Sequence, residues 1–214
     1  MNADTDMNNV KGARGADIGR GMPPGLQQPV MDSQFVFRAV LLALSRPGTI
    51  VELGRLPQPP APLFPSTAAM LLSLCDMDTP LWLGPAMLDK ETAGYFRFHC
   101  GCQLTATPEH AAFAVIQDGM KLPDLTRFRV GTPEYPDRGA TLIVQVDSLE
   151  CGVGWRISGP GVKGAENLDV RGLSRDFWPF FAANREKFPT GVDVLLVTKA
   201  SVCGLPRSAR VEGW

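Results

Sequence analysis

The sequence predicts an α/β domain of three layers, in which a mixed β-sheet carries helices on both faces. Two of the expected strands, residues 112–116 and 141–146, are almost continuously apolar. Such strands are typical of a sheet that is covered on both sides, whereas a half-exposed sheet alternates apolar and polar residues. Short connections between some strands also favour antiparallel pairing, so we expect the sheet to be mixed.

The composition is that of a soluble globular protein: 214 residues, 44% of them hydrophobic and 20% charged, with a formal net charge of −1. This charge is atypical of a nucleic-acid-binding protein, and no run approaches the ~18–20 apolar residues of a membrane span. The five cysteines form no obvious disulfide framework, and no secretion signal is recognisable. We therefore expect a cytoplasmic protein that binds neither nucleic acid nor membrane.

The chain is expected to consist of a tail and one domain. Residues 1–30 are rich in glycine and proline and poor in apolar residues, which predicts a disordered tail. Residues 31–214 are long enough to form a single domain with its own core. Within this domain, five prolines between residues 57 and 65 predict an extended connector instead of a helix or strand.

The first half of the domain is expected to begin with a helix. Asp32 or Ser33 caps this helix, which ends at Arg46 because Pro47 follows. Its apolar stripe, expected to face the core, consists of Phe37, Val40, Leu41 and Leu44. The next expected elements are a strand over residues 49–53, a helix over 67–75 capped by Ser66, a strand over 81–83 and a helix over 88–96.

The second half is expected to be richer in strands. They cover residues 112–116, 141–146, 155–158 and 192–198, with residues 202–205 pairing beside the last of them. Residues 173–184 predict an aromatic-rich helix, although Pro179 counts against its continuity.

Two sequence patterns resemble ligand-binding motifs without meeting their requirements. Gly159, Gly161 and Gly164 match the glycine spacing of a dinucleotide-binding loop, but no good helix follows, so we interpret them as a turn. His99, Cys100, Cys102 and His110 match no standard zinc spacing, so no metal site is predicted.

Four residues form candidate contacts for an anionic ligand. Arg97 and His99 project to one face if their segment is extended, and such a pair holds a phosphate; the alternative is a structural pairing. Asp76 and Asp78 offer carboxylates for the magnesium ion of a nucleotide, although the same residues are typical of a turn. Lys199 follows an apolar strand but has no recognisable partners for a pyridoxal phosphate (PLP) ring, which favours an exposed lysine.

Eight segments, in order, resemble the H-subunit family of the bacterial carbon–phosphorus lyase system for phosphonate degradation. The resemblance covers about residues 31–210. The matching residues are Gln34, Phe37 and Arg38 with Ser45, Arg46, Pro47 and Gly48; Asp76, Asp78, Thr79, Pro80, Trp82 and Leu83; Arg97, Phe98 and His99; Ala112, Phe113, Ala114 and Val115; Gly139, Ala140, Thr141, Leu142, Ile143, Gln145 and Val146; Arg156, Gly159 and Gly161; Phe188, Pro189, Gly191 and Asp193; and Leu205, Pro206 and Arg207.

The resemblance implies a fold similar to the large domain of PLP-dependent transferases, without PLP itself. It implies a non-catalytic or co-catalytic subunit that is dimeric alone and joins the G, I and J subunits in a core complex. With the G, I and L subunits, such proteins support the transfer of a phosphonate onto the ribose C1 of MgATP, with loss of adenine. No catalytic residue is predicted, and the candidate ligand-binding residues are Arg46, Asp76, Asp78, Arg97 and His99.

Two other functions remain open from the sequence. One is a free-standing small-molecule transferase that uses the region of Asp76, Asp78, Arg97 and His99. The other is a module that binds a nucleotide or a phosphonate without catalysis. Turnover by the isolated chain distinguishes the first of these from an assembly subunit.

Self-association is expected through the aromatic-rich segment near residue 180. Phe177, Trp178, Phe180 and Phe181 span too wide an arc of a helix for one core face, and arginines flank them. Aromatic residues beside arginines are typical of interface centres, so these four residues are the candidate dimer interface. The alternative is that Pro179 bends the segment and places all four rings in the chain's own core.

Overall fold

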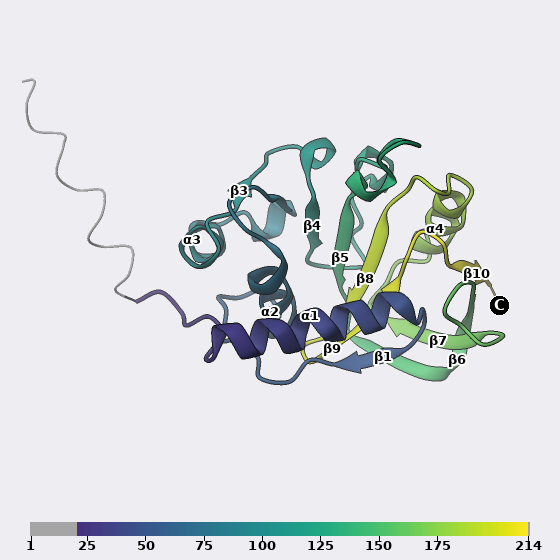
Figure 1. The fold of residues 1–214 in the computed structure, drawn as a ribbon, viewed down its shortest axis with the longest axis horizontal. Helices are drawn as coiled ribbons and strands as arrows, with labels where there is room; N and C mark the ends of the chain where they lie inside the picture. The colour runs from purple at the N-terminus through teal and green to yellow at the C-terminus, as the bar shows by residue number, and fades with distance from the viewer. Residues whose placement is uncertain (1–20, 214) are drawn as a thin grey trace, which may run out of the picture.

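The computed structural model describes residues 21–213, and within them the chain forms an α/β fold with two sheets (Figure 1). The larger sheet has seven strands in the order β1-β9-β8-β5-β4-β2-β3, and the smaller has three in the order β10-β6-β7. The helices are α1 Pro29–Ser45, α2 Pro65–Leu74, α3 Lys90–His99 and α4 Phe177–Arg185.

The strand bounds agree with most of the predicted strands. The larger sheet contains β1 Ile50–Glu52, β2 Pro80–Leu83, β3 Gln103–Leu104, β4 Phe113–Ile116, β5 Thr141–Gln145, β8 Asp193–Val197 and β9 Ser201–Leu205. The smaller sheet contains β6 Ser148–Ser158, β7 Glu166–Arg171 and β10 Arg210–Glu212. The predicted connector carries no helix or strand over residues 57–64.

The larger sheet is mixed, as the sequence predicts. The strands β3, β2, β4, β5 and β8 run parallel to their neighbours, whereas β9 pairs antiparallel with β8 and β1. The single turn between β8 and β9 explains their pairing, because antiparallel neighbours need only a tight connection. The helices α1, α2 and α3 pack on one face of this sheet, and α4 packs on the other.

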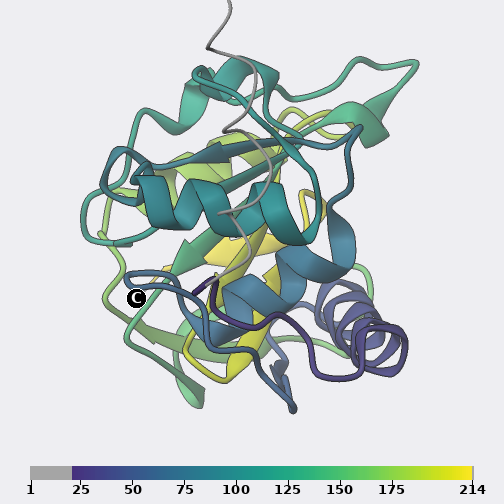
Figure 2. The same ribbon diagram turned by 90° about the vertical axis from the view of Figure 1, so that its left-hand side faces the viewer.

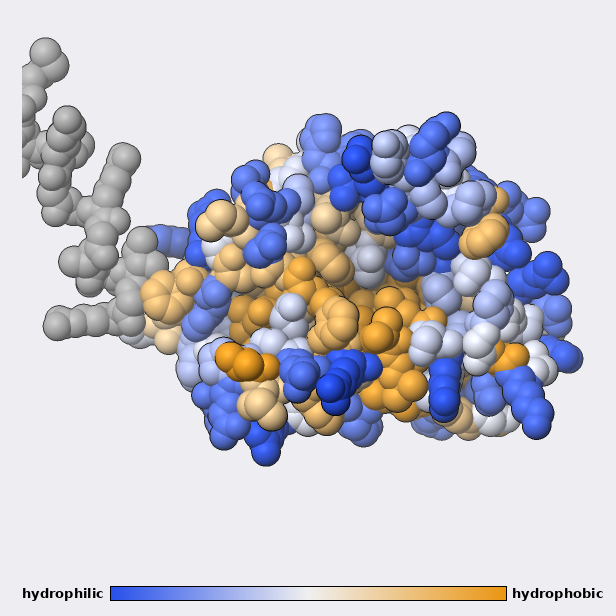
Figure 3. Space-filling view, viewed as in Figure 1, coloured by the Kyte–Doolittle hydropathy of each residue, from blue (hydrophilic) through white to orange (hydrophobic). Residues whose placement is uncertain are grey.

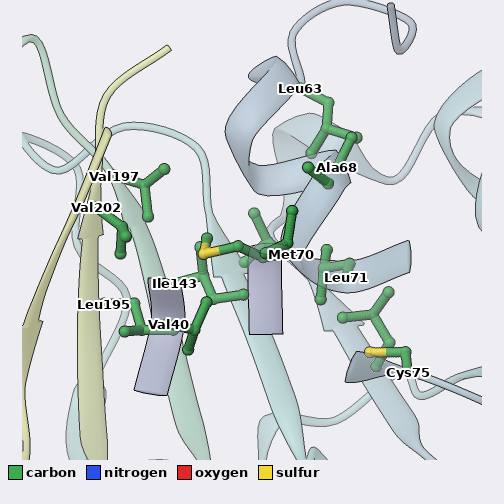
Figure 4. Packing of buried hydrophobic residues seen from close by; sticks show 14 of the residues in the cluster. Val40, Leu63, Ala68, Met70, Leu71, Cys75, Ile143, Leu195, Val197 and Val202 are labelled. Atoms are coloured by element: carbon green, nitrogen blue, oxygen red, sulfur yellow. The ribbon is translucent and has the colours of Figure 1, made fainter. Parts of the chain in front are cut away.

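Side chains alternate between two cores on opposite faces of this sheet. Ile143 of β5 and Leu195 of β8 pack with α1, α2 and α3, and Figure 4 shows the side chain of Met70 of α2 extending toward Ile143. The neighbouring residues of β5 and β8 point to the other face, where they pack with α4 and the smaller sheet. The strands are therefore buried on both sides, and helices lie on both faces (Figures 1 and 2).

Close backbone packing fixes α1 against β9. A Cβ atom placed on Gly204 would lie 2.6 Å from the backbone of Ala43, so a side chain at this position would displace the helix. At the end of α1, a Cβ atom on Gly161 would collide with the backbone oxygen of Ser45. Glycine is required at both contacts by close approach, and at Gly161 also by a φ of 88°.

The predicted orientation of α1 is wrong in part. Its buried residues are Asp32, Val36, Ala39, Val40 and Ala43. Of the expected stripe, Val40 is buried and Leu44 packs partly buried against the core. Phe37 and Leu41 are 50% and 56% exposed. The small side chains bring the helix close to β9, and the larger apolar residues of the expected stripe remain beside the contact instead of in it.

The N-terminal residues that the structure describes differ from the expected tail. Met22 and Leu26 pack against the core, and the carbonyl oxygens of Pro23 and Pro24 contact α3. The helix α1 begins at Pro29, and Asp32 lies inside it, where its carboxylate accepts a hydrogen bond from the backbone N–H of Gln28 at 2.8 Å. Residues 22–30 thus belong to the fold, while the expected tail over residues 1–20 lies outside the described residues.

The smaller sheet is predicted only in part: the expected strand over residues 155–158 lies within β6, whereas β7 and β10 are not predicted. The glycine-rich segment is a turn, as interpreted, but it joins two antiparallel strands, β6 and β7. Residues 166–171, which are expected to make no good helix, form the strand β7. The predicted helix near residue 180 exists as α4, because Pro179 occupies its first turn, where a backbone N–H has no intrahelical partner.

Candidate functional site

The carboxylates of Asp76 and Asp78 belong to a tight turn before β2. The Oδ1 atom of Asp76 accepts hydrogen bonds from the backbone N–H of Asp78 at 3.0 Å and from the Thr79 hydroxyl at 2.6 Å. The hydroxyl of Thr79, helped by the backbone N–H of Asp78, lowers the pKa of Asp76. Both carboxylates are exposed, and the interpretation of this segment as a turn is confirmed.

Arg97 and His99 do not form the expected anion-binding pair. They lie on α3 and not on an extended segment, so residues two apart point in different directions around the helix. Arg97 is exposed, whereas the Nε2 atom of His99 lies 2.9 Å from the Pro23 carbonyl oxygen. The ring of His99 also packs against Tyr95, with the ring centres 4.5 Å apart, so its role is structural.

The structure does not bring Arg46 to the other candidate residues. Arg46 is exposed at the end of α1, directly before the edge strand β1. Asp76 and Asp78 precede β2, which four strands separate from β1 in the sheet order. The five candidate ligand-binding residues therefore do not converge on one site.

Three cysteines lie close to the Asp76 turn. Burial raises the pKa of the Cys75 thiol well above its ordinary value, and the nearby Cys100 and Asp76 raise it further. A hydrogen bond with Cys100, together with burial, raises the pKa of Cys102. Within residues 21–213, no group of three or more histidine, cysteine or acidic side chains has the arrangement of a metal site.

Lys199 is exposed in the turn between β8 and β9.

In the described part of the chain, no helix is long and apolar enough to cross a membrane.

An ion pair joins two residues of the segments that resemble the H-subunit family. The side chains of Asp193 and Arg207 approach to 2.6 Å and are largely shielded from solvent. This pair ties the loop after β9 to the start of β8, so its role is structural.

The candidate dimer interface on α4 is wrong, because the rings lie in the chain's own core. Phe177 and Phe181 are fully buried, Trp178 is 4% exposed, and Phe180 is half-buried. The ring of Trp178 stacks on Trp155 of β6, with the ring centres 4.6 Å apart and the planes inclined by 19°. The smaller sheet supplies the second apolar surface that the wide aromatic arc needs.

The exposed apolar surface lies instead on α1. We define the α1 surface as its exposed large apolar side chains, which are Val30, Met31, Phe35, Phe37, Leu41 and Leu42. Figure 3 shows a hydrophobic area over α1 that continues onto the strands beside it. A cavity of about 150 Å³ lies beside this area. It is lined by Phe37, Leu41 and Leu44 of α1 and by Leu74 and Phe113.

The α1 surface contains part of the segment that the sequence analysis assigned to the core. The periodicity of the apolar residues in this helix is compatible with more than one orientation of the helix. Residue size distinguishes the buried face of α1 from its exposed face. The face with the small residues Ala39 and Ala43 is buried, because it allows close contact with Gly204. Exposed apolar patches of this kind mark interaction surfaces.

Comparisons with known proteins agree with the resemblance seen in the sequence. Residues 24–212 match the family described as bacterial phosphonate metabolism protein (PhnH). A protein of Rhizobium meliloti (strain 1021), named alpha-D-ribose 1-methylphosphonate 5-triphosphate synthase subunit PhnH, is 40% identical over 86% of this chain and 92% of its own length. HtxG of Stutzerimonas stutzeri, named as a candidate C-P lyase subunit, is 30% identical over 84% of this chain and 85% of its own length. The chain therefore belongs to the PhnH family of bacterial phosphonate metabolism proteins.

Proposed function

We propose that this chain is an assembly subunit of a carbon–phosphorus lyase core complex in the breakdown of organic phosphonates. Family membership and the names of both relatives support this proposal. With the G, I and L subunits, the chain supports a reaction in which a phosphonate displaces adenine from the ribose C1 of MgATP. The product is a ribose 1-phosphonate 5-triphosphate, and the J subunit is a further partner.

The α1 surface is the observation that carries a role in assembly. Phe37 and Leu41 expose half or more of their side chains on one helix, beside an apolar cavity. Arg38 and Arg46 are exposed on the same helix and its end. Apolar anchors with arginines at the rim are the composition of interface centres, and burying them against a partner is favourable.

The scattered candidate residues favour assembly over independent catalysis. A free-standing transferase was expected to use Asp76, Asp78, Arg97 and His99, but the two aspartates form a turn and His99 binds backbone. Catalysis requires groups held together around one reacting centre. We therefore assign the chemistry of the complex to its other subunits and assign positioning and assembly to this chain.

The fold is proposed to be related to the large domain of PLP-dependent transferases, with no PLP bound. The parallel strands flanked by helices are compatible with that relationship. The exposed position of Lys199 supports the absence of an internal aldimine, because such a lysine needs a desolvated site. Borohydride treatment that fixed PLP onto Lys199 would contradict this part of the proposal.

In isolation, the chain is expected to form a homodimer through the α1 surface. The same surface meets another subunit once the complex assembles, since a dimer patch is a preformed apolar site. The test is to replace Leu41 with aspartate, which places a charge in the apolar contact. Leu88→Asp is the matched control, because both leucines are 56% exposed but Leu88 lies outside the α1 surface.

Sedimentation at micromolar concentration measures dimerisation, and co-purification with the G, I and J subunits measures assembly. Leu41→Asp should weaken both by about tenfold or more, because an unpaired charge would be buried in the contact. Leu88→Asp should leave both unchanged. A wild-type chain that stays outside the complex would overturn the proposed function, and equal effects of the two variants would overturn the assigned surface.

A further inference from the structure

A cavity of about 260 Å³ lies where β2 and β4 end, away from the candidate residues of the sequence analysis. Trp82 of β2 and Ile116 of β4 form part of its wall, and the residues that follow each strand complete it. Asp76 and Asp78, in contrast, precede β2 and lie toward the amino end of that strand. The length of β2 thus separates the polar residues of the cavity from Asp76 and Asp78.

The connections of the sheet leave a crevice at this position. β2 and β4 are parallel neighbours, but the chain leaves β2 toward β3 on one side and leaves β4 toward β5 on the other. The strand order therefore reverses between β2 and β4. In open α/β sheets, ligands bind at such a reversal, outside the carboxyl ends of the strands.

One side chain of the cavity has an unmet hydrogen-bonding requirement. Gln117 follows β4 and lines the cavity, and its buried side-chain oxygen has no hydrogen-bond partner within residues 21–213. A buried polar atom without a partner is costly, so native structures usually supply one from the protein, water or a ligand. An amide oxygen requires an N–H or O–H donor.

The rest of the cavity favours a flat group. Trp82 is 7% exposed and is held edge-on by Phe128, with ring centres 5.4 Å apart. Gly84 also lines the cavity, and a Cβ atom at this position would lie 3.2 Å from the Val115 carbonyl oxygen and 3.9 Å from the Trp82 ring. Sites for whole drug-sized ligands usually measure about 300–1,000 Å³, so this cavity suits one ring system with the remainder of the ligand outside.

Charged groups lie next to this space. The Nζ atom of Lys121 is 3.6 Å from the Oδ2 atom of Asp118, and their side chains are 86% and 42% exposed. An ammonium group pairs with phosphate, and a carboxylate accepts hydrogen bonds from ribose hydroxyls. The apolar wall, the amide and the charged pair thus correspond to the base, the amino group and the sugar-phosphate of a nucleotide.

We propose that the β2–β4 cavity binds an adenine nucleoside or nucleotide. The base lies beside Trp82, and any phosphate extends toward Lys121. The exocyclic amino group donates to the Gln117 side-chain oxygen, which turns from its buried position into the cavity. Glutamine is suited to adenine, because its amide matches the donor and acceptor of the base edge. This proposal deepens the proposed function, since the complex consumes MgATP, and it gives this chain a role in holding the nucleotide.

Calorimetric titration of the full chain tests the proposal, with adenosine, ATP without metal, guanosine and tripolyphosphate as separate probes. Adenosine should bind more tightly than guanosine, and ATP more tightly than adenosine if Lys121 contacts phosphate. Gln117→Leu should weaken adenosine binding by about fivefold, the effect of one net hydrogen bond. Ala86→Trp, at an exposed residue of the wall, should fill the cavity and abolish binding.

Two matched controls separate the cavity from general surface effects. Gln103→Leu removes an exposed amide on β3 outside the cavity and should leave binding unchanged. Lys90→Ala should likewise leave ATP binding unchanged, whereas Lys121→Ala should reduce ATP binding to the level of adenosine. Thermal unfolding of each variant verifies that it is folded.

The proposal is overturned if adenosine does not bind, or if tripolyphosphate binds as well as ATP. It is also overturned if neither Gln117→Leu nor Ala86→Trp changes the affinity for adenosine. Co-purification distinguishes this failure from that of the proposed function. A chain that assembles with its partners but binds no adenosine remains an assembly subunit without a nucleotide site.

Discussion

The helices α1 and α4 have similar apolar content but opposite environments. Phe37 and Leu41 of α1 are half or more exposed, whereas Phe177 and Phe181 of α4 are fully buried. The difference comes from what lies over each helix. The smaller sheet covers α4 through Trp155, but no described element covers the outer side of α1. Aromatic content thus indicates that a helix needs a partner, and only the tertiary structure shows whether that partner is internal.

Truncation of one ring on each helix should give the largest contrast. Phe177→Ala should lower the free energy of unfolding by about 3–5 kcal/mol, because it leaves a cavity in a closely packed core. Phe37→Ala should cost about 1 kcal/mol or less, since half of that ring already contacts water. Urea unfolding of the two variants measures both values, at a protein concentration low enough for the chain to be monomeric by sedimentation. Equal losses in the monomer would mean that the chain itself covers the α1 surface.

The contact between the smaller sheet and α4 should show a moderate, measurable coupling. Trp155 and Trp178 are stacked, with ring centres 4.6 Å apart. A double-mutant cycle with Trp155→Ala and Trp178→Ala should give a coupling energy of about 0.5–1.5 kcal/mol. Coupling near zero would contradict the role of the smaller sheet as the cover of α4. The pair Trp155 and Phe37, from separate regions, serves as the additive control.

An effect of similar small size is expected for α3, which is anchored by a cap. Asp89 accepts hydrogen bonds from the backbone N–H groups of Glu91 and Thr92, both at 2.8 Å. Burial acts to raise the pKa of Asp89, but the bonds from Thr92 and Glu91 outweigh it and lower the pKa. Asp89→Ala should therefore cost about 1 kcal/mol at neutral pH.

The sign of the pH dependence follows from this lowered pKa. The contribution of Asp89 is fully present above the unfolded-state pKa of about 4 and is lost as the pH falls through the folded-state value. Urea unfolding of wild type and Asp89→Ala should therefore converge in acid. Asp78→Ala, in an exposed turn, should show a smaller difference at neutral pH. A gap between wild type and Asp89→Ala that widened in acid would contradict the assigned cap.

The central strands were predictable because their residues are apolar on both faces. β4, β5 and β8 lie within one or two residues of the expected bounds, and the parallel and antiparallel mixture is confirmed. β7 was not predictable in the same way. Its sequence, Glu166–Arg171, contains charged and polar residues, and only Leu168 is fully buried. Such a strand is stabilised mainly by its pairing with β6, which local sequence does not reveal.

The candidate site shows the same limit. Turn formation by Asp76 follows from local chemistry, so the sequence identified it correctly as one alternative. The cavity beside Gln117 depends on β2 and β4 being neighbours, although about 30 residues separate them in the chain. No spacing within one segment signals this juxtaposition. The sheet order is needed to show where the connections diverge.

The packing of α1 on β9 has a consequence during synthesis. The helix ends at Ser45 and its partner strand begins at Ser201, so more than 150 residues are made between them. During this interval the inner face of α1, with Val36 and Ala43, has no β9 to cover it, and the outer face is apolar as well. Nascent chains with such uncovered helices are prone to aggregate and are typical clients of chaperones. Truncations that end before β9 should accordingly accumulate in the insoluble fraction, while chains that include β9 bury one side of the helix.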